Sequence, residues 1–587
     1  MIGLNTNTNN KNNYISKLMK DVLESWPWYF TSIFATVAYL LMDFYMRKMV
    51  GVVADDIIYR NDTFLKSLLL LLAAAFFASP FHGLSTYTKG YMAEEVLLKL
   101  RLAIGRKTKK LSMHYLETHE SAEIISHLGT ELNTLNRFTY YGLSMVTTLF
   151  VQLIGVTAFM LSVDFQITVL FISMSLLVLP ISVLMTKQVR KNEKEYLERL
   201  AKSQQCAREG IHFITMIKSY LLEDRMFSRY KEAMDKTTDS AVKNENRIAY
   251  VTSAGMAIGF IPFTAMIALG VYRISEGTLT QGELLSLLTI GGGFFSWLQG
   301  TPDVVAYLKK AQVACERIYS FLDTPEEENG METECRKKDS VVVKLNEVYF
   351  AYPGEKNILN GVSLEIREGE SVALVGASGS GKTTLIKLIC GLMKPTGGSI
   401  EVFGNLLEEW DKAAMRQNIS LVGQVNNLFP GNLRDNLLVD QKDIKDEELI
   451  HLCRQAGLET LIAERGLDGE VGEAGYQFSG GEKQRIHILR ALLSNAKLIL
   501  MDEPTSALDA VSEEAVQTCL DMLTKEKTTL TIAHRMHTIQ NAGRIYVLHQ
   551  GKIVQCGSHE ELINQEGRYR EMLQYQELKG GDQLCRQ

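Results

Sequence analysis

Long apolar runs fill the first half of the chain, and polar segments separate them. A helix of about 20 mostly apolar residues can cross a bilayer. Lipid offers no hydrogen bonds to the backbone, so each such run should be α-helical. Six runs meet this description and are the predicted membrane spans: 27–49, 63–87, 139–161, 167–187, 250–272 and 282–300.

The links between these runs alternate in length. Links 50–62, 162–166 and 273–281 are short, whereas 88–138 and 188–249 are long, polar and rich in helix formers. Lys and Arg gather in the two long links and the N-terminal tail. The positive-inside rule therefore places both termini and both long links in the cytosol.

The long links are expected to continue the spans as helical arms. Their tips are predicted near 113–128 and 208–227. The pattern leaves two interpretations open, since these segments suit either solvated hairpins or elements that contact a cytosolic domain.

Four polar residues lie in or near the predicted spans: Asp43, Lys66, His82 and Gln299. An ionisable group inside a membrane is a candidate functional residue. Asp43 and His82 are therefore candidate substrate contacts. The alternative is structural, because a side chain near a span end can extend its polar tip to the interface.

The second half of the chain reads as a soluble α/β domain. After a charged segment at 323–340, the residues of 341–352 alternate as in a strand. The formal net charge of −6 gives no basic field, so nucleic acid is not an expected partner. The eight cysteines form no CxxC pair, and all fall on the predicted cytosolic side, where thiols stay reduced.

A phosphate-binding loop follows the apolar strand 372–375. The motif G-x-x-x-x-G-K-[ST] spans Gly376–Thr383 and leads into a helix-like run. In such loops the backbone holds phosphates, the Lys reaches the terminal phosphates and the hydroxyl ligates Mg²⁺. The predicted ATP contacts here are Gly376, Ala377, Ser378, Gly379, Ser380, Gly381, Lys382, Thr383 and Thr384.

Two acids end a second apolar strand in "KLILMDEP", residues 497–504. Asp502 is expected to hold Mg²⁺ directly or through water. Glu503 is placed to act as the general base toward an attacking water. The cofactors predicted from these motifs are ATP and Mg²⁺.

The segment "QFSGGEKQR" (477–485) resembles the signature of the ABC transporter superfamily, usually LSGGQ. The resemblance implies that the signature of one subunit closes on ATP held by the phosphate loop of another. Ser479, Gly480, Gly481 and Glu482 are then expected ATP contacts. Phe478 and Glu482 replace the usual Leu and Gln, and Glu482 adds a negative charge near the closing interface.

Further segments match the same family. The resemblance implies that Tyr352 stacks on adenine, although a strand-core role is the alternative. Gln424 resembles the Q-loop glutamine that senses Mg²⁺ and the γ-phosphate, and His534 resembles the switch histidine. The segments 506–509 and 471–475 resemble the D-loop and an exporter-type loop that touches the membrane arms.

The first half resembles the six-helix exporter-type (type IV) membrane domain in topology and in weak motifs such as "TQGELL" before the sixth span. The expected fold is an α-helical membrane domain of six spanning helices with long cytosolic extensions, plus an α/β P-loop ATPase domain. The expected domains are a cytosolic tail (1–24), the transmembrane domain (25–322), a linker (323–340), the ABC nucleotide-binding domain (341–578) and a C-terminal tail (579–587).

This resemblance implies an ATP hydrolase that exports an amphipathic or hydrophobic solute, such as a drug, lipid or peptide. One chain carries one half of each composite site, so a dimer is expected, most simply a homodimer in a bacterial plasma membrane. A heterodimer, or an importer built on the exporter fold, remains the alternative. Six spans argue against a soluble ABC ATPase, and no Asn-Lys-x-Asp guanine motif appears.

Overall fold

The computed structural model describes most of the chain. The backbone is described for residues 8–118, 127–336, 340–424, 427–439, 444–472, 475–504, 516–517, 519–520, 527–533 and 539–574. Within these ranges, the side chains of 8–13, 178–188, 190 and 294–306 lie outside the description. The chain divides into a helical unit, Met1–Lys109 with Ser121–Thr324, and a nucleotide unit, Lys110–Glu120 with Pro325–Gln587.

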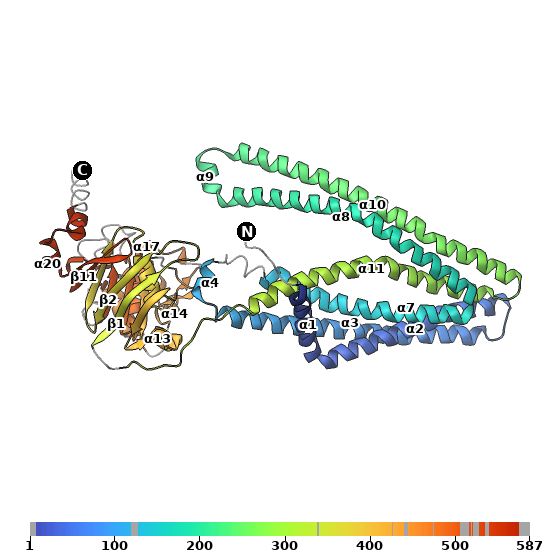
Figure 1. The fold of residues 1–587 in the computed structure, drawn as a ribbon. Helices are drawn as coiled ribbons and strands as arrows, with labels where there is room; N and C mark the ends of the chain where they lie inside the picture. Colours follow the sequence, from blue (N-terminus) through green and yellow to red (C-terminus); the bar gives the residue numbers. More distant parts are fainter. Residues whose placement is uncertain are drawn as a thin grey trace. The chain divides into compact units, whose positions relative to one another are not determined.

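Long helices make up the helical unit (Figure 1). The α8 and α10 helices pair as a hairpin with α9 at its tip, and α2 pairs with α3. The elements are α1 (Thr8–Glu24), α2 (Trp26–Ile58), α3 (Phe64–Thr108), η1 (His127–Glu131), α6 (Leu132–Arg137), η2 (Phe138–Gly142), α7 (Leu143–Val163), α8 (Phe165–His212), α9 (Ile214–Ser219), α10 (Glu223–Ser275) and α11 (Gln281–Leu322).

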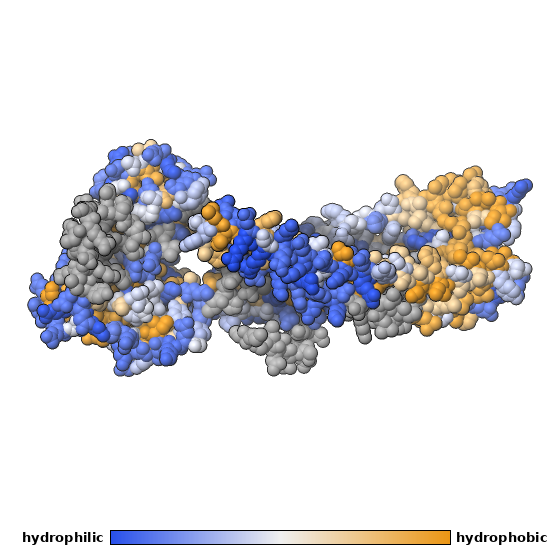
Figure 2. Space-filling view, turned by 90° about the horizontal axis from the view of Figure 1, so that it is seen from above, coloured by the Kyte–Doolittle hydropathy of each residue, from blue (hydrophilic) through white to orange (hydrophobic). Residues whose placement is uncertain are grey.

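The predicted spans fall within these helices. By length and composition, four described helical stretches are apolar enough to cross a membrane: Trp26–Ile58, Phe64–Thr108, Gly129–Val163 and Glu223–Ser275. The other two predicted spans lie in α8, which opens with the shorter apolar stretch Phe165–Leu177, and in α11. Figure 2 shows apolar residues gathered on one part of the helical unit and polar residues on another, as expected for helices that leave the bilayer.

Local capping explains where two of the long helices begin. Asp164 is the N-cap of α8, and its side chain accepts a hydrogen bond from the Ile167 N–H. Thr280 and Glu283 form a capping box at the start of α11. These bonds satisfy N–H groups that have no partner within the helix.

The α2 helix packs very closely against the start of α11. A Cβ atom at Gly282 would lie 2.0 Å from the Gly51 carbonyl oxygen, so only glycine fits there. The Asp55 carboxylate accepts hydrogen bonds from the Thr280 hydroxyl at 2.6 Å and from the Gly282 N–H at 2.7 Å. Backbone contact and hydrogen bonds therefore fasten these two helix ends together.

Both intramembrane candidates have contacts within the helical unit. Asp43 forms an ion pair with Arg47 at 2.8 Å, and Arg47 also donates to the Thr289 carbonyl oxygen at 2.6 Å. The exposed His82 ring packs against Tyr39 with ring centroids 4.8 Å apart. These contacts give both residues structural partners, and their role toward substrate stays a prediction.

Two larger sheets and one strand pair form the nucleotide unit. An antiparallel sheet has the order β2-β1-β4-β5, a six-stranded sheet has the order β12-β11-β3-β10-β9-β6, and β7 pairs with β8. Strands β11, β3, β10, β9 and β6 are parallel, and β12 is antiparallel. The strands are β1 (Val341–Phe350), β2 (Leu359–Arg367), β3 (Ser371–Gly376), β4 (Gly397–Val402), β5 (Asn405–Leu406), β6 (Ile419–Val422), β7 (Gly431–Asn432), β8 (Glu470–Val471), β9 (Leu498–Asp502), β10 (Thr528–Ile532), β11 (Arg544–His549) and β12 (Lys552–Gly557).

Helices and apolar clusters surround these sheets. The interior strands β9 and β10 are buried at every position, as expected for parallel strands covered on both faces. The helices of this unit are α4 (Met113–Thr118), α12 (Lys382–Ile389), α13 (Lys412–Gln417), α14 (Leu433–Leu437), α15 (Asp446–Gln455), α16 (Glu459–Arg465), α17 (Gly480–Leu493) and α20 (His559–Ile563).

The segment after α11 also lies against this unit. The Gly330 N–H donates to the Trp410 carbonyl oxygen, and the Arg336 N–H donates to the Phe403 carbonyl oxygen. Arg416 forms a bidentate ion pair with Glu327. Residues 325–336 are thus attached by backbone and side-chain bonds to the turn after β4, to the segment after β5 and to α13.

Candidate nucleotide site

Parallel strands bring the predicted nucleotide motifs to one edge of the six-stranded sheet. The phosphate loop follows β3, the acidic pair ends β9, and Gln424 comes two residues after β6. His534 comes two residues after β10 and lies, with the predicted D-loop, outside the described residues. Because these strands run parallel, their carboxyl ends meet at the same edge, which is where α/β sheets bind ligands.

The phosphate loop holds its lysine in a buried position. The Lys382 ammonium donates to the carbonyl oxygens of Gly376 at 2.9 Å and Ala377 at 3.0 Å. Burial lowers the pKa of Lys382, and the carboxylates of Glu503 and Asp502 act in the opposite direction. The lysine therefore stands as a buried cation beside both acids.

The remaining loop residues suit a close approach to phosphate. Gly379 and Gly381 have φ angles of +78° and +104°, which favour glycine. Ser380 has a buried hydroxyl with no hydrogen-bond partner in the described part of the chain. Ser378 and Thr384 flank this turn, and α12 begins at Lys382, so a helix N-terminus faces the loop. A buried polar atom without a partner fits a phosphate-binding site.

Thr383 and Asp502 meet beside the loop. The Thr383 side chain lies near enough to the Asp502 carboxylate to influence its pKa. Burial raises the pKa of Asp502, Glu503 raises it further, and the Thr383 side chain lowers it. No cluster of three or more His, Cys, Asp or Glu side chains in the described ranges could hold a metal. A hydroxyl and one carboxylate fit Mg²⁺ instead, which takes further oxygens from phosphates and water.

Glu503 has an unusual backbone conformation. Its φ angle is +50°, and its N–H donates to the Ile532 carbonyl oxygen at 3.3 Å. The Gln424 side-chain amide donates to the Glu503 carboxylate at 3.3 Å. A non-glycine residue at positive φ costs about 1–3 kcal/mol and is typical of functional sites. The structure thus brings two of the predicted catalytic residues together.

Tyr352 lies just after β1 and is partly buried. Its ring packs edge-to-face on Phe350, with centroids 5.1 Å apart. Tyr352 is neither fully buried nor fully exposed, so part of the residue remains accessible to a planar ligand. Both the adenine-stacking role and the core-packing role are compatible with this position.

The signature segment caps its own helix. Ser479 is the N-cap of α17, and Ser479 and Glu482 form a capping box. The α17 helix begins at Gly480, where an added Cβ would meet nothing within 4 Å, and Gly481 is buried. The Ser-Gly-Gly turn therefore leaves an open approach to a helix N-terminus.

Phe478, the first departure from the family signature, is a packing residue. Its side chain is buried in the apolar cluster that contains Ile486 and Leu489, and the Arg465 guanidinium lies 5.1 Å from its ring centroid. An aromatic ring can replace a leucine here because it points into the domain and leaves the turn unchanged.

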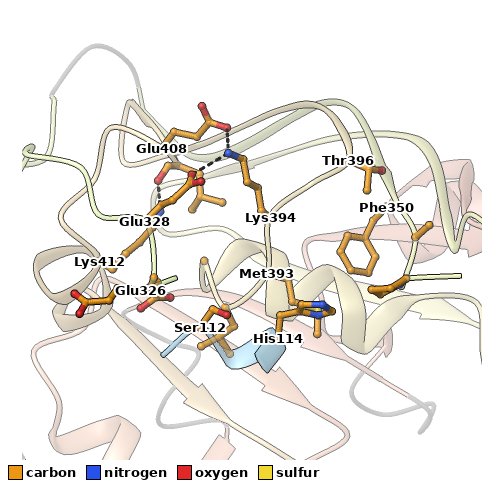
Figure 3. A pocket seen from close by; sticks show the side chains of 16 residues that line it. Ser112, His114, Glu326, Glu328, Phe350, Met393, Lys394, Thr396, Glu408 and Lys412 are labelled. Carbon is orange, nitrogen blue, oxygen red and sulfur yellow. Dashed lines mark hydrogen bonds and ion pairs between the residues drawn. The ribbon is translucent and has the colours of Figure 1, made fainter. Parts of the chain in front are cut away.

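Residues 110–118, at the start of the first predicted arm tip, belong to the nucleotide unit and have contacts within it. Glu117 of α4 forms an ion pair with Lys387 of α12 at 2.7 Å. Figure 3 shows Ser112 and His114 beside Met393 at a cavity of about 360 Å³. Lys394 pairs at the rim with Glu328 and Glu408. The sequence left open whether this segment is a solvated hairpin or a contact element, and no sequence pattern identified Lys387 as a partner.

Comparisons with known proteins match both halves of the chain. The ABC transporter transmembrane region matches residues 28–298, and the ABC transporter domain matches residues 359–506. The ATP-dependent lipid A-core flippase of Chromobacterium violaceum is 31% identical over 497 residues, which cover 83% of this chain and 84% of the flippase. The chain belongs to the ABC transporter family.

Two further relatives of this ABC transporter carry different names. A Bacillus subtilis protein named for multidrug export is 28% identical over 543 residues, covering 90% of this chain and 93% of the relative. Antigen peptide transporter 2 of Rattus norvegicus is 29% identical over 494 residues, covering 82% of this chain and 69% of the relative.

The family confirms the fold class and the coarse function predicted from the sequence. This ABC transporter is a multi-pass integral membrane protein that binds ATP and couples an ATPase to exporter-type transport. Its half-transporter architecture, with one membrane region and one nucleotide domain, implies dimerisation.

Proposed function

We propose that two identical chains form a homodimer that exports an amphipathic or hydrophobic solute. ATP would bind at two composite sites between head-to-tail nucleotide domains. The observation that carries this proposal is that one chain holds an intact set of half-sites: Lys382 and Thr383 at the phosphate loop, Asp502 and Glu503 at the strand edge, and Ser479 at an open helix N-terminus. A heterodimer is the alternative, but heterodimers often carry one degraded site.

The residues at the strand edge have distinct proposed roles. Thr383 and Asp502 would hold Mg²⁺, which when bound neutralises phosphate charge, and Gln424 would sense the metal and the γ-phosphate. Glu503 would accept a proton from the attacking water as the general base. His534 would contact the γ-phosphate, and Tyr352 would stack on adenine.

The second arm tip is proposed to dock on the partner's nucleotide domain. The α9 tip exposes large apolar side chains: Ile211, Phe213, Ile214, Met216, Tyr220 and Leu221. The nucleotide unit has a cavity of about 240 Å³ lined by Phe429, Leu437, Leu438 and Val439. A large exposed apolar patch often marks an interaction site, so the exposed tip of one copy is a suited partner for the apolar side of this cavity in another copy, with Arg490 and His487 on its polar side.

The cargo class and the location also belong to this proposal. The three named relatives act on a lipid, on drugs and on peptides by name, and each class includes molecules that partition into a bilayer. The Lys and Arg bias of the long links supports a cytosolic nucleotide domain and cytosolic termini. We propose a bacterial plasma membrane as the location.

Subunit complementation tests the composite site. Lys382→Ala should inactivate the phosphate loop, and Ser479→Arg should block the signature with a bulky cation. Each variant alone is expected to lose ATP hydrolysis in proteoliposomes. A mixed dimer of the two has one site built from the intact phosphate loop of one chain and the intact signature of the other.

The mixed dimer should regain a substantial part of wild-type hydrolysis, up to about half if the two sites act independently. Co-expression with two different affinity tags isolates this dimer from the two inactive homodimers. A mixed dimer as inactive as its parents contradicts shared sites between identical chains. Stimulation of ATPase activity by a panel of lipids, drugs and peptides then identifies the cargo class.

A further inference from the structure

We propose that Glu482 competes with ATP for the signature serine and so sets the ATP concentration at which the nucleotide domains close. This inference rests on the proposed function, in which Ser479 contacts the γ-phosphate held by the partner chain. It assigns a role to the second departure of this chain from the family signature.

The Glu482 carboxylate occupies both donors of Ser479. One carboxylate oxygen accepts from the Ser479 N–H at 2.7 Å and from the Ser479 hydroxyl at 2.8 Å. The Glu482 N–H donates in turn to the Ser479 hydroxyl oxygen at 3.2 Å. The serine hydroxyl thus donates its one proton, and accepts one hydrogen bond, within its own turn.

A hydroxyl has one proton and can donate it to one acceptor at a time. For Ser479 to donate to a phosphate oxygen, its hydroxyl must leave the Glu482 carboxylate. The carboxylate also carries a negative charge one helical turn into α17, where a phosphate would approach. Closure therefore has to overcome both a lost hydrogen bond and a repulsion between like charges.

The cap itself does not require this charge. A capping box forms with either Glu or Gln at the third helical position. The usual family glutamine could accept from the Ser479 N–H while remaining neutral. Glutamate at this position therefore adds a charged acceptor that competes with the phosphate for the Ser479 hydroxyl. This competition acts on the closure of the two nucleotide domains more than on the first binding of ATP to the phosphate loop.

The chain contains a matched control for the cap. Ser558 and Glu561 form the same capping box at α20, with the Ser558 N–H donating to the Glu561 carboxylate at 2.8 Å. This box does not belong to the signature. Glu561→Gln therefore repeats the chemical change of Glu482→Gln outside the proposed ATP contacts.

The test compares ATP dependence of hydrolysis by the full chain in lipid nanodiscs. Glu482→Gln should lower the apparent KM for ATP about three- to tenfold, as expected from removing one charge–charge repulsion at roughly 4 Å in a solvated interface. Glu561→Gln should leave the apparent KM unchanged. The difference between wild type and Glu482→Gln should shrink as salt increases, because salt screens exposed charges.

Closure of the nucleotide domains can also be measured without ATP turnover, in a protein that lacks the proposed general base. In Glu503→Gln protein, Glu482→Gln should lower the ATP concentration needed for half-maximal nucleotide trapping by a similar factor. Glu482→Ala should shift both quantities in the same direction, even though it also removes the cap. Values within about twofold of wild type for both Glu482 variants overturn the inference.

The two proposals can fail separately. Restored hydrolysis in the mixed Lys382→Ala and Ser479→Arg dimer, together with an unchanged KM for Glu482→Gln, rejects only the competition. A mixed dimer that stays inactive rejects the shared site itself and the competition with it.

Discussion

Glu117 at the tip of the first arm lies 2.7 Å from Lys387, which stands on the helix that begins at the phosphate loop. Lys387 follows Lys382 by five residues, or about one and a half helical turns. Both side chains are about one quarter exposed, at 26% and 29%. An ion pair within the nucleotide unit thus joins α4 to the helix that carries the ATP-binding lysine.

Reversing the charge at this contact should uncouple the arm from hydrolysis. Glu117→Lys places two cations together and is expected to reduce cargo-stimulated ATPase activity about two- to fivefold, in keeping with the modest energies of solvated ion pairs. Unstimulated hydrolysis should change little. The measurement is ATPase activity in proteoliposomes with and without a stimulating solute.

Two further variants control this experiment. The double variant Glu117→Lys with Lys387→Glu should recover stimulation by restoring the pair with opposite polarity. Lys344→Glu disrupts the pair with Glu365, 3.5 Å away on the antiparallel sheet, and should leave stimulation intact. Equal losses in Lys344→Glu and Glu117→Lys would show a general effect of charge reversal.

Removing the proposed general base should separate binding from turnover. Glu503→Gln keeps the size and the contact with Gln424 but accepts no proton, so hydrolysis should fall by about 10²–10⁴-fold. Bound ATP should be retained, as measured by nucleotide content after rapid desalting. Glu464→Gln on the exposed face of α16 is the matched control. Near-normal turnover in Glu503→Gln removes this residue from the reaction.

Burial and the neighbouring Arg490 lower the pKa of His487 to about 4, against an ordinary value of about 6.5. Below pH 6.5 the unfolded chain binds a proton that the folded domain excludes, so stability falls as pH decreases from about 6.5 toward 4. At pH 5 this residue should cost about 1–2 kcal/mol of stability relative to pH 7.

The variant His487→Gln checks this expectation. Glutamine can donate to the Asn427 carbonyl oxygen, which lies 3.0 Å from the His487 ring nitrogen, and it does not titrate. In this variant, the thermal midpoint for unfolding of the nucleotide domain should fall less between pH 7 and pH 5 than in the wild-type protein. Parallel pH curves for the two proteins would show that His487 does not contribute.

Adding one methyl group at the α2–α11 contact should destabilise the helical unit. At Gly282 the new Cβ would meet the Gly51 backbone, which can move only if the helices separate. Gly282→Ala is expected to cost about 1–3 kcal/mol and to lower the thermal midpoint in detergent. At Gly83 in α3 an added Cβ meets nothing within 4 Å, so Gly83→Ala should leave the midpoint unchanged or raise it.

Hydropathy predicts the helices of the membrane region but not their ends. The first span is predicted at 27–49, whereas α2 continues to Ile58 through a polar segment. The carboxylate of Asp56, near this end, accepts hydrogen bonds from Asn61, Thr63 and Ser67. Such contacts are made with residues of the following loop and helix. A hydropathy average over the first span carries no information about them.

The nucleotide motifs are predictable because their spacing is set by strand topology. Each follows a strand of one parallel sheet, so the sequence order places Thr383, Asp502, Glu503 and Gln424 at a common edge. The Glu117–Lys387 pair joins residues 270 positions apart on two ordinary helical segments. Nothing in either local sequence distinguishes these two side chains from other exposed charges.

The hydrogen bonds of the signature turn also could not be predicted from the sequence. The replacement of Gln by Glu is visible in the sequence and raises the question of a charge at the interface. Which group that carboxylate contacts depends on the conformation of the Ser479 cap. The distances make the carboxylate a direct partner of the serine.

The α10 helix runs without a break for 53 residues, from the cytosolic tip to the last external turn of the proposed topology. At 1.5 Å per residue this is a rod of about 80 Å. Rotating such a rod by about 5° about one end displaces the other end by roughly 7 Å, which is more than the pitch of about 5.4 Å of an α-helix. A rotation of a few degrees at one end of α10 therefore becomes a displacement of several ångströms at the other end, on the far side of the helical unit.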